Sequence, residues 1–180
     1  MSSAQESGQG VRKALADAEV SLRRRDYEGV ISAAQQALVA NPNSGVAHRF
    51  LYEAYLYRHD SVRSKEARDN ALRLLKAPKD AREYEARGFC DLFNYPIGAR
   101  VDFIEAIRLD PKYASAYNNR GRSYAYKKKH DLAIADYSEA IRLDPKYVSA
   151  YYYRAVAYRR IGREDLAKAD ESAAKGVNGK

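Results

Sequence analysis

Residues that could support catalysis are few, and they lie far apart in the sequence. His48, His59 and His130 have no spacing that suits a metal site. Cys90 follows Phe89 in a helical segment, so we interpret it as a packed hydrophobic residue rather than a nucleophile. The sequence also contains no glycine-rich loop of the kind that binds phosphate. It therefore predicts a protein that is not an enzyme and that needs no metal or cofactor.

Two short basic runs are the next candidates for a binding site. Residues 127–129 are three lysines and residues 23–25 are three arginines. Each run ends a helical segment, where the helix dipole favours cations, so the simpler interpretation is a solvated turn. The other interpretation is a contact with acidic protein or phosphate. Because the runs do not form one contiguous basic stripe, we do not expect nucleic-acid binding.

The composition is that of an ordinary globular chain with a modest positive charge. The 180 residues are 46% apolar, and the formal net charge is +8. The basic excess is spread along the chain and gives only a mild preference for acidic partners. No apolar run is long enough to span a bilayer, so we expect no membrane span.

The single cysteine and the first residues bear on the compartment. With Cys90 alone, no internal disulfide can form, which is compatible with a reducing environment. The first ten residues, MSSAQESGQG, lack the basic and apolar segments of a secretory leader. We therefore expect a cytoplasmic protein, although a secreted chain whose leader had been removed would read the same.

One segment of the chain is almost copied 34 residues later. Residues 105–117 read EAIRLDPKYASAY and residues 139–151 read EAIRLDPKYVSAY, which agree at twelve of thirteen positions. Pro42, Pro78, Pro111 and Pro145 each follow a helical segment, at intervals of 36, 33 and 34 residues. A repeated segment with a period in this range is typical of a stacked repeat array.

Each repeat contains two amphipathic helical segments. In the best-preserved unit, apolar residues recur at three- and four-residue steps over 114–128 and again over 131–143. A short polar turn joins them, which predicts an αα-hairpin, and we find no convincing alternating strand pattern. We therefore expect an all-α chain with a single solenoid domain over 10–175. Its repeats are expected at about 11–42, 45–78, 80–111, 114–145 and 148–175, with a disordered segment over 1–9 and a loose end over 176–180.

The array resembles the tetratricopeptide repeat (TPR) family, whose pattern is aromatic, Leu-Gly, Tyr, Ala, aromatic, Ala and Pro at set offsets. The fourth unit meets this pattern except that arginine replaces the leucine; its residues are Tyr117, Arg120, Gly121, Tyr124, Ala133, Tyr137, Ala140 and Pro145. Gly121 and Ala133 are small where the two helices of a hairpin must approach closely. The resemblance implies a right-handed superhelical solenoid of about five helix-turn-helix repeats.

In TPR proteins, the first helix of each hairpin borders a concave groove that binds an extended peptide or a helix. The resemblance therefore implies groove residues at Arg49, Tyr57, Arg82, Phe93, Asn118, Asn119, Arg122, Tyr126, Tyr152, Tyr153, Arg159 and Arg160. Asparagine can both donate to and accept from a peptide backbone, and arginine can form a bidentate pair with a carboxylate. Tyrosine adds apolar contact area. The alternative is that Tyr126, Tyr152 and Tyr153 simply pack between helices.

Some TPR domains bind the C-terminal carboxylate of chaperones through lysine, asparagine and arginine at set positions. In this chain, Arg49 and Glu53, then Glu85 and Phe89, stand at several of those positions, and only Asn119 matches. The resemblance therefore does not extend to a chaperone adaptor of that type.

The sequence predicts a scaffold or adaptor that binds a peptide or helical segment of another protein, with a preference for acidic segments. Two alternatives stay open. One is self-assembly into a homo-oligomer through the exposed ends of the solenoid. The other is RNA or polyanion binding through the basic surface, which predicts a steep dependence on salt.

Overall fold

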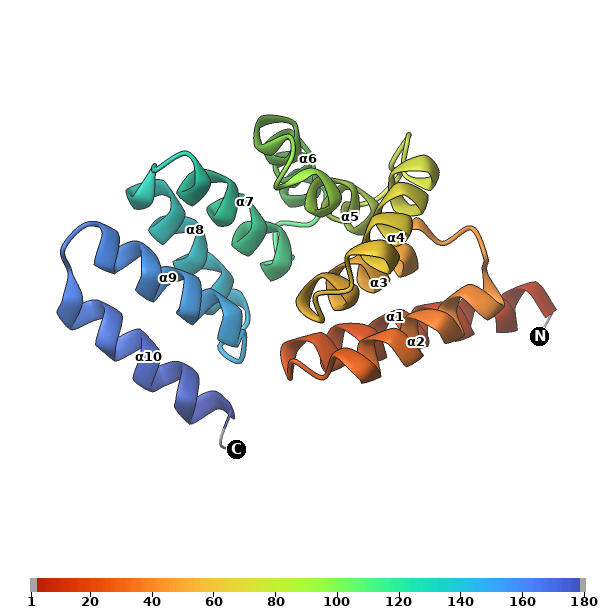
Figure 1. Cartoon of the computed structure of the whole chain (residues 1–180), viewed down its shortest axis with the longest axis horizontal. Helices are drawn as coiled ribbons and strands as arrows, with labels where there is room; N and C mark the ends of the chain where they lie inside the picture. The colour runs from red at the N-terminus through yellow and green to blue at the C-terminus, as the bar shows by residue number, and fades with distance from the viewer. Residues whose placement is uncertain (1–2, 179–180) are drawn as a thin grey trace. The chain divides into compact units, whose positions relative to one another are not determined.

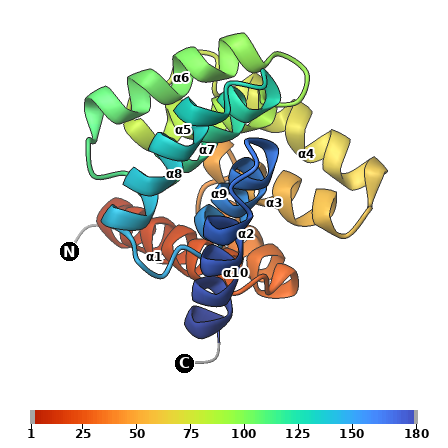
Figure 2. The ribbon, with the colours of Figure 1, turned by 90° about the vertical axis from the view of Figure 1, so that its left-hand side faces the viewer.

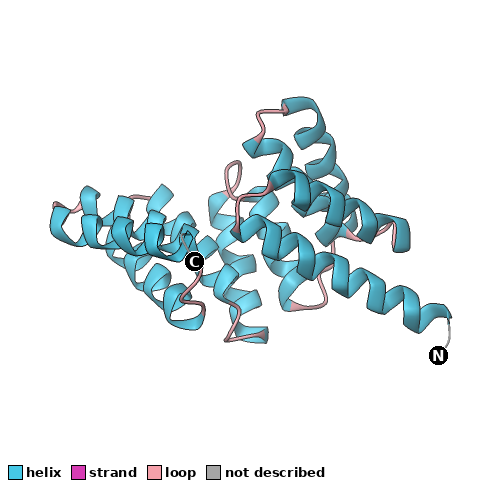
Figure 3. Cartoon of the chain, turned by 90° about the horizontal axis from the view of Figure 1, so that it is seen from below, coloured by secondary structure: helices cyan, strands magenta, loops and turns pink. Residues whose placement is uncertain are grey.

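The computed structural model describes residues 3–178, and its regular elements there are all helices (Figures 1 and 3). They belong to two compact units, residues 1–90 and 91–180. The expected all-α repeat architecture is confirmed. The expected single solenoid domain over 10–175 stays a prediction.

The first unit contains two helical hairpins and one further helix. α1 (Ser3–Arg23) pairs with α2 (Tyr27–Ala40), and α3 (Gly45–Tyr57) pairs with α4 (Ser61–Leu74). Because α2 also packs against α3, the second hairpin stacks on the first (Figure 1). α5 (Ala81–Asp91) follows and reaches the boundary of the unit.

The second unit contains one helix followed by two helical hairpins. α6 (Pro96–Leu109) packs against α7 (Ala114–Tyr126), which pairs with α8 (His130–Leu143). α9 (Val148–Arg160) pairs with α10 (Glu164–Asn178), and α9 packs against α8 (Figure 2). α7 also touches α9, so the first helices of these two hairpins lie next to each other.

Capping side chains and prolines mark the ends of several helices. Asp26, Ser44 and Asp60 each accept a hydrogen bond from the backbone N–H three residues later, which caps α2, α3 and α4. Pro96 is the first residue of α6, where its missing N–H removes no helical bond. α6 and α8 end directly before the Asp-Pro pairs of the copied segment.

Four hairpin turns share one backbone geometry. Arg25, His59, Lys128 and Gly162 have φ angles of 59°, 58°, 58° and 77°. In each turn the N–H of the next residue donates to the carbonyl oxygen five residues before it, at 2.9–3.0 Å. Only the last turn has a glycine there, so the other three hold a side chain in the left-handed region, at a cost of roughly 1–2 kcal/mol each.

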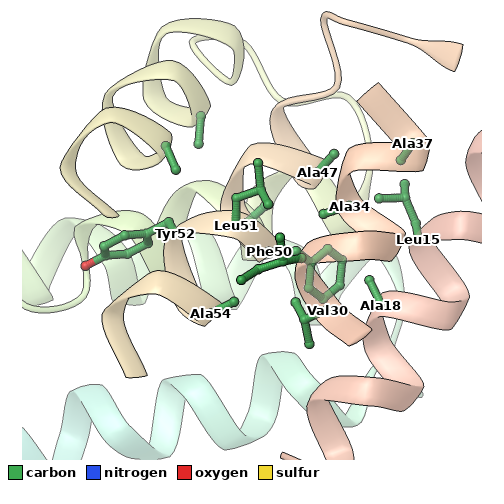
Figure 4. Packing of buried hydrophobic residues seen from close by; sticks show 14 of the residues in the cluster. Leu15, Ala18, Val30, Ala34, Ala37, Ala47, Phe50, Leu51, Tyr52 and Ala54 are labelled. Carbon is green, nitrogen blue, oxygen red and sulfur yellow. The ribbon is translucent and has the colours of Figure 1, made fainter. Parts of the chain in front are cut away.

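The core of the first unit relies on alanine where helices meet. Ala18, Ala34 and Ala47 are fully buried on α1, α2 and α3, while Val30 and Phe50 fill the space around them (Figure 4). Small residues on facing helices allow the backbones to approach closely, and the larger side chains complete the packing. Cys90 is fully buried in the same cluster, which confirms its interpretation as a packed hydrophobic residue.

The core of the second unit depends on one glycine. A Cβ atom on Gly121 would lie 2.7 Å from the Tyr137 ring and 3.2 Å from the carbonyl oxygen of Ala133. The predicted close approach of α7 to α8 at Gly121 is therefore confirmed. Tyr137 itself is 1% exposed and fills the space beside this contact.

The helices extend further toward the chain ends than the sequence led us to expect. α1 begins at Ser3 and α10 ends at Asn178, which differs from the disordered segment over 1–9 and the loose end over 176–180. Neither segment contains proline, and a glycine inside a helix costs only about 1 kcal/mol. Residues 1–2 and 179–180 lie outside the described residues. Within residues 3–178, no helix combines the length and the apolar character that crossing a membrane requires.

Candidate functional site

Side chains at equivalent positions of α7 and α9 form the candidate site. Asn118, Arg122 and Tyr126 recur every four residues and so share one stripe of α7. The equivalent stripe of α9 lies 34 residues later. We call the two stripes the α7–α9 face; its members are Asn118, Arg122, Tyr126, Tyr152, Val156 and Arg160.

Arg122 links the two helices. Its guanidinium carbon lies 5.5 Å from the ring centre of Phe93 and 5.0 Å from that of Tyr153. Its Nη1 donates to Oδ1 of Asn119 at 3.1 Å. The aromatic faces attract the cation, and the hydrogen bond fixes its orientation. Arg122 is therefore held in place and helps to order α7 relative to α9.

The tyrosines of α9 divide into a packed one and an exposed one. Tyr153 stacks on buried Tyr137, with ring centres 6.0 Å apart and planes 25° apart. Burial raises the pKa of Tyr137, so its hydroxyl stays neutral. Tyr152 meets Tyr153 edge to face at 5.5 Å and leaves 58% of its surface exposed. The alternative that these tyrosines only pack between helices therefore fits Tyr153 and not Tyr152.

Exposed aromatic rings are the main apolar feature of the face. Tyr126 is 60% exposed on the last turn of α7, and Tyr152 is 58% exposed on the first half of α9. Phe93, which contacts Arg122, is 43% exposed. Exposed aromatic groups with nearby polar groups are typical of surfaces that bind other proteins.

Two buried asparagines lie at the base of the face. Asn118 is 2% and Asn119 1% exposed. Nδ2 of Asn119 is 3.5 Å from Oγ of Ser115, and its Oδ1 accepts from Arg122. Oδ1 of Asn118 has no hydrogen-bond partner among the residues that the structure describes. A buried amide oxygen without a donor costs roughly 1–3 kcal/mol.

Two arginine–aspartate bridges support the face from within the hairpins. Arg120 donates to both oxygens of Asp136 at 2.9 and 2.7 Å, and Arg154 donates to both oxygens of Asp170 at 2.8 and 2.6 Å. Each bond raises the pKa of its arginine. Arg154 also donates to Oγ of Ser138 at 2.9 Å, which joins α9 to the preceding hairpin.

These bridges were missed in the sequence, although a signal was present. The arginine stands where the TPR pattern has leucine, and the aspartate follows 16 residues later in both repeats. A polar replacement at an apolar position indicates a buried partner, and the shared spacing identifies it.

Arg159 and Arg160 have different surroundings. Arg159 turns toward α10, where it binds Glu171 at 2.5 Å and Glu164 at 3.3 Å, and the bond to Glu171 is the main cause of its raised pKa. Arg160 is exposed on the stripe of α9. We therefore keep Arg160 in the α7–α9 face and leave out Arg159.

Three of the expected groove residues belong to the first unit. Arg49 is 4% exposed, and its guanidinium binds Glu53 and Glu85 at 3.0 Å each. Tyr57 stacks on a tyrosine of α2 at 5.2 Å, and Arg82 lies 3.5 Å from a glutamate of α1. Arg49 supports the interior of its unit and does not present a surface. Because all three residues lie on α3 or α5, none of them is part of the α7–α9 face.

The chemistry of the face is that of non-covalent recognition. It combines exposed aromatic rings, a buried amide oxygen and the exposed cation of Arg160. No group of three metal-binding side chains gathers anywhere in residues 3–178.

Comparisons with known proteins agree with this fold. Residues 121–162 match the family model of the TPR repeat. No curated protein sequence matches the chain. A thermophilic TPR protein of Thermus thermophilus, TTC0263, is similar in structure with a TM-score of 0.68 and 20% identity, over 94% of this chain and 92% of that one.

Two further TPR structures are similar in fold. YrrB, a TPR protein with an unusual peptide-binding site, gives a TM-score of 0.53 at 17% identity, over 93% of this chain and 86% of its own. The second TPR of Spaghetti (RPAP3), bound to an HSP90 peptide, gives 0.53 at 24% identity, over 58% of this chain and 98% of its own. The resemblance predicted from the sequence is thereby confirmed.

Proposed function

We propose that this protein of tetratricopeptide repeats is a non-catalytic scaffold or adaptor, and that its α7–α9 face binds a peptide segment of a partner protein. The observation that carries the proposal is the pair of exposed rings, Tyr126 and Tyr152, 60% and 58% accessible on equivalent helices. Leaving two large aromatic rings in water forgoes the free energy that burying them would provide, and a partner would supply that burial.

The polar groups of the face favour a peptide as the occupant. Arg160, which is exposed on the stripe of α9, would pair with a carboxylate of the peptide. The net charge of +8 adds a mild preference for an acidic segment. The peptide-bound fold of RPAP3 and the peptide-binding site of YrrB support the same class of ligand.

The test begins with selection of peptides from a displayed random library on the full chain. Dissociation constants of the enriched peptides are then measured for the wild type and for the double variant Tyr126→Ala/Tyr152→Ala. Since buried tyrosines are frequent energetic centres of interfaces, we expect the double variant to bind at least tenfold more weakly. Both substitutions are at exposed positions, so the variant should keep its helical content.

The matched control is Leu132→Ala, which removes an exposed side chain, 47% accessible, from α8 rather than from the face. It should leave peptide affinity unchanged. Equal affinity of the wild type and the double tyrosine variant would place the binding site elsewhere on the chain.

A further inference from the structure

The second hairpin contains a pocket that belongs to no site described so far. It has a volume of about 150 Å³ and lies between α3 and α4. Its apolar base is formed by Leu51 and Ala67, and its other lining residues are His48, Tyr55, Arg63, Glu66 and Asn70. All of them lie within the first unit.

Two residues that line the pocket occupy the repeat positions of an ion pair in the fourth and fifth hairpins. Leu51 and Ala67 are 16 residues apart, as are Arg120 and Asp136, and as are Arg154 and Asp170. The register is fixed by the proline before each hairpin. His48 bonds the carbonyl of Pro42 six residues before it, and Tyr117 and Tyr151 bond the equivalent proline carbonyls at 3.3 Å.

The fifth repeat shows what occupies this space when the ion pair is present. The guanidinium of Arg154 lies 5.8 Å from the ring centre of Tyr151 and 5.9 Å from that of Tyr158. It is also bound to both oxygens of Asp170. In the second hairpin the rings at those two positions are His48 and Tyr55, but leucine and alanine stand where the later hairpins have arginine and aspartate.

The rim of the pocket offers hydrogen-bond acceptors. The Glu66 carboxylate has no ion pair among the described residues, and Asn70 adds an amide oxygen. Burial, then the cation of Arg73, lowers the pKa of His48, so its imidazole is neutral near pH 7 and one ring nitrogen accepts. The cation of Arg63 is already bound to Asp60 and lies 4.7 Å from the Tyr55 ring centre.

We propose that this pocket binds the guanidinium of an arginine side chain from a partner protein, in the place that Arg120 and Arg154 fill within their own hairpins. Glu66 and Asn70 accept its N–H groups, and its plane lies beside the ring of His48, because the Tyr55 ring already carries the guanidinium of Arg63. An ammonium lacks the planar fork, so the pocket prefers arginine over lysine. This site is separate from the α7–α9 face and does not depend on it.

The test is an NMR titration of the ¹⁵N-labelled full chain with N-acetyl-arginine amide, with N-acetyl-lysine amide as the matched probe at the same ionic strength. We expect the arginine probe to shift backbone amides within residues 48–70 and to bind at least fivefold more tightly than the lysine probe. Equal binding of the two probes, or shifts confined to other parts of the chain, would overturn the proposal.

Two variants make the test specific. The double change Leu51→Arg/Ala67→Asp installs the ion pair of the later hairpins, so it should fill the pocket and abolish the shifts. Glu66→Gln changes an exposed position and should weaken arginine binding at least threefold. It provides the test if the double variant does not fold. Unchanged arginine binding in Glu66→Gln would contradict the assigned role of the carboxylate. Tyr126→Ala/Tyr152→Ala should bind the arginine probe like the wild type, which separates this proposal from the proposed function.

Discussion

At the residue scale, one repeat position performs the same structural task with different side chains. Tyr117 and Tyr151 donate their hydroxyl hydrogens to proline carbonyls at 3.3 Å, and His48 makes the equivalent bond to Pro42. A phenol does this at any physiological pH, whereas an imidazole titrates near neutrality. The second hairpin therefore has a titratable imidazole at the position that holds a tyrosine in the fourth and fifth.

The pH dependence of folding should reveal His48. Its pKa is lowered in the folded chain from 6.5, first by burial and then by Arg73. The unfolded chain therefore binds the proton more readily, and stability falls as the pH drops below about 6.5. We expect His48→Tyr to lose less stability than the wild type between pH 7.5 and 5.5, measured as the shift of the urea midpoint. Equal losses in the two proteins would assign the acid sensitivity to other groups.

Residue roles could be predicted from the sequence only in part. The register assigned Asn118, Asn119, Arg122 and Tyr126 to the groove, and all four lie on α7. It could not show that Arg49 is buried against Glu85 of α5, because an ion pair between helices depends on contacts that no local spacing encodes. Exposure of Tyr152 beside packed Tyr153 likewise depends on which side of α9 faces Tyr137.

At the element scale, the hairpin turns show that the fold tolerates unfavourable backbone geometry. Lys128 and Gly162 occupy the same turn position in consecutive repeats, with φ angles of 58° and 77°. Glycine is the residue best suited to this region, and lysine is not. The same element is therefore built with and without local strain.

Exchanging residues at this turn position should change stability in opposite directions. Lys128→Gly removes the strain and should stabilise the chain by roughly 1 kcal/mol, while Gly162→Ala should destabilise it by a similar amount. Neither change removes a buried contact, since nothing lies within 4 Å of a Cβ added at Gly162 and Lys128 is exposed. Thermal denaturation of both variants measures the effect, and a shift in the same direction for both would refute it.

The contact between α7 and α8 gives a second prediction at this scale. Gly121→Ala would place a methyl group 2.7 Å from the Tyr137 ring and 3.2 Å from a backbone carbonyl. We expect a loss of about 1–3 kcal/mol, because buried Tyr137 has little room to move. The matched control, Gly10→Ala, meets no atom within 4 Å in α1 and should stabilise by roughly 0.5–1 kcal/mol. Chemical denaturation distinguishes the two, and a stabilised Gly121→Ala would contradict the packing described.

Helices could be predicted well because their signals are local. The prolines at near-regular intervals and the three- and four-residue apolar steps mark the pairs of helices that the structure contains. The first turns of α1 carry neither signal, so its start at Ser3 was not anticipated. The pocket of the second hairpin was not predicted, because its lining residues come from two helices and their spacing in the sequence does not mark a cavity.

At the scale of the whole molecule, the charge is spread rather than concentrated. The formal charge of +8 belongs to a chain whose arginines are often paired, as in the bridges to Asp136 and Asp170. On the α7–α9 face, Arg160 is the exposed cation of the α9 stripe, while Arg122 lies between two rings. The partner that we propose for this face would therefore be bound mainly through aromatic contact.

Salt dependence separates this account from polyanion binding. For a selected peptide, affinity should fall only weakly as salt is added. The slope of log affinity against log salt should have a magnitude of about one or less, because few ions are released. An RNA that neutralised many lysines and arginines would give a slope of several. Fluorescence anisotropy measures the affinity of both ligands between 50 and 300 mM salt, on the order of the physiological range. A steep slope for RNA together with affinity stronger than that of the peptide would favour the nucleic-acid alternative.

The most direct test of the central claim is to map where a selected peptide contacts the full chain by NMR. The account predicts that the largest backbone and side-chain shifts fall on residues 118–126 and 152–160, with Asn118 and Tyr152 among the strongest. Shifts concentrated on α8 and α10, or on the first unit, with α7 and α9 unchanged, would contradict the assignment of the binding surface to the α7–α9 face.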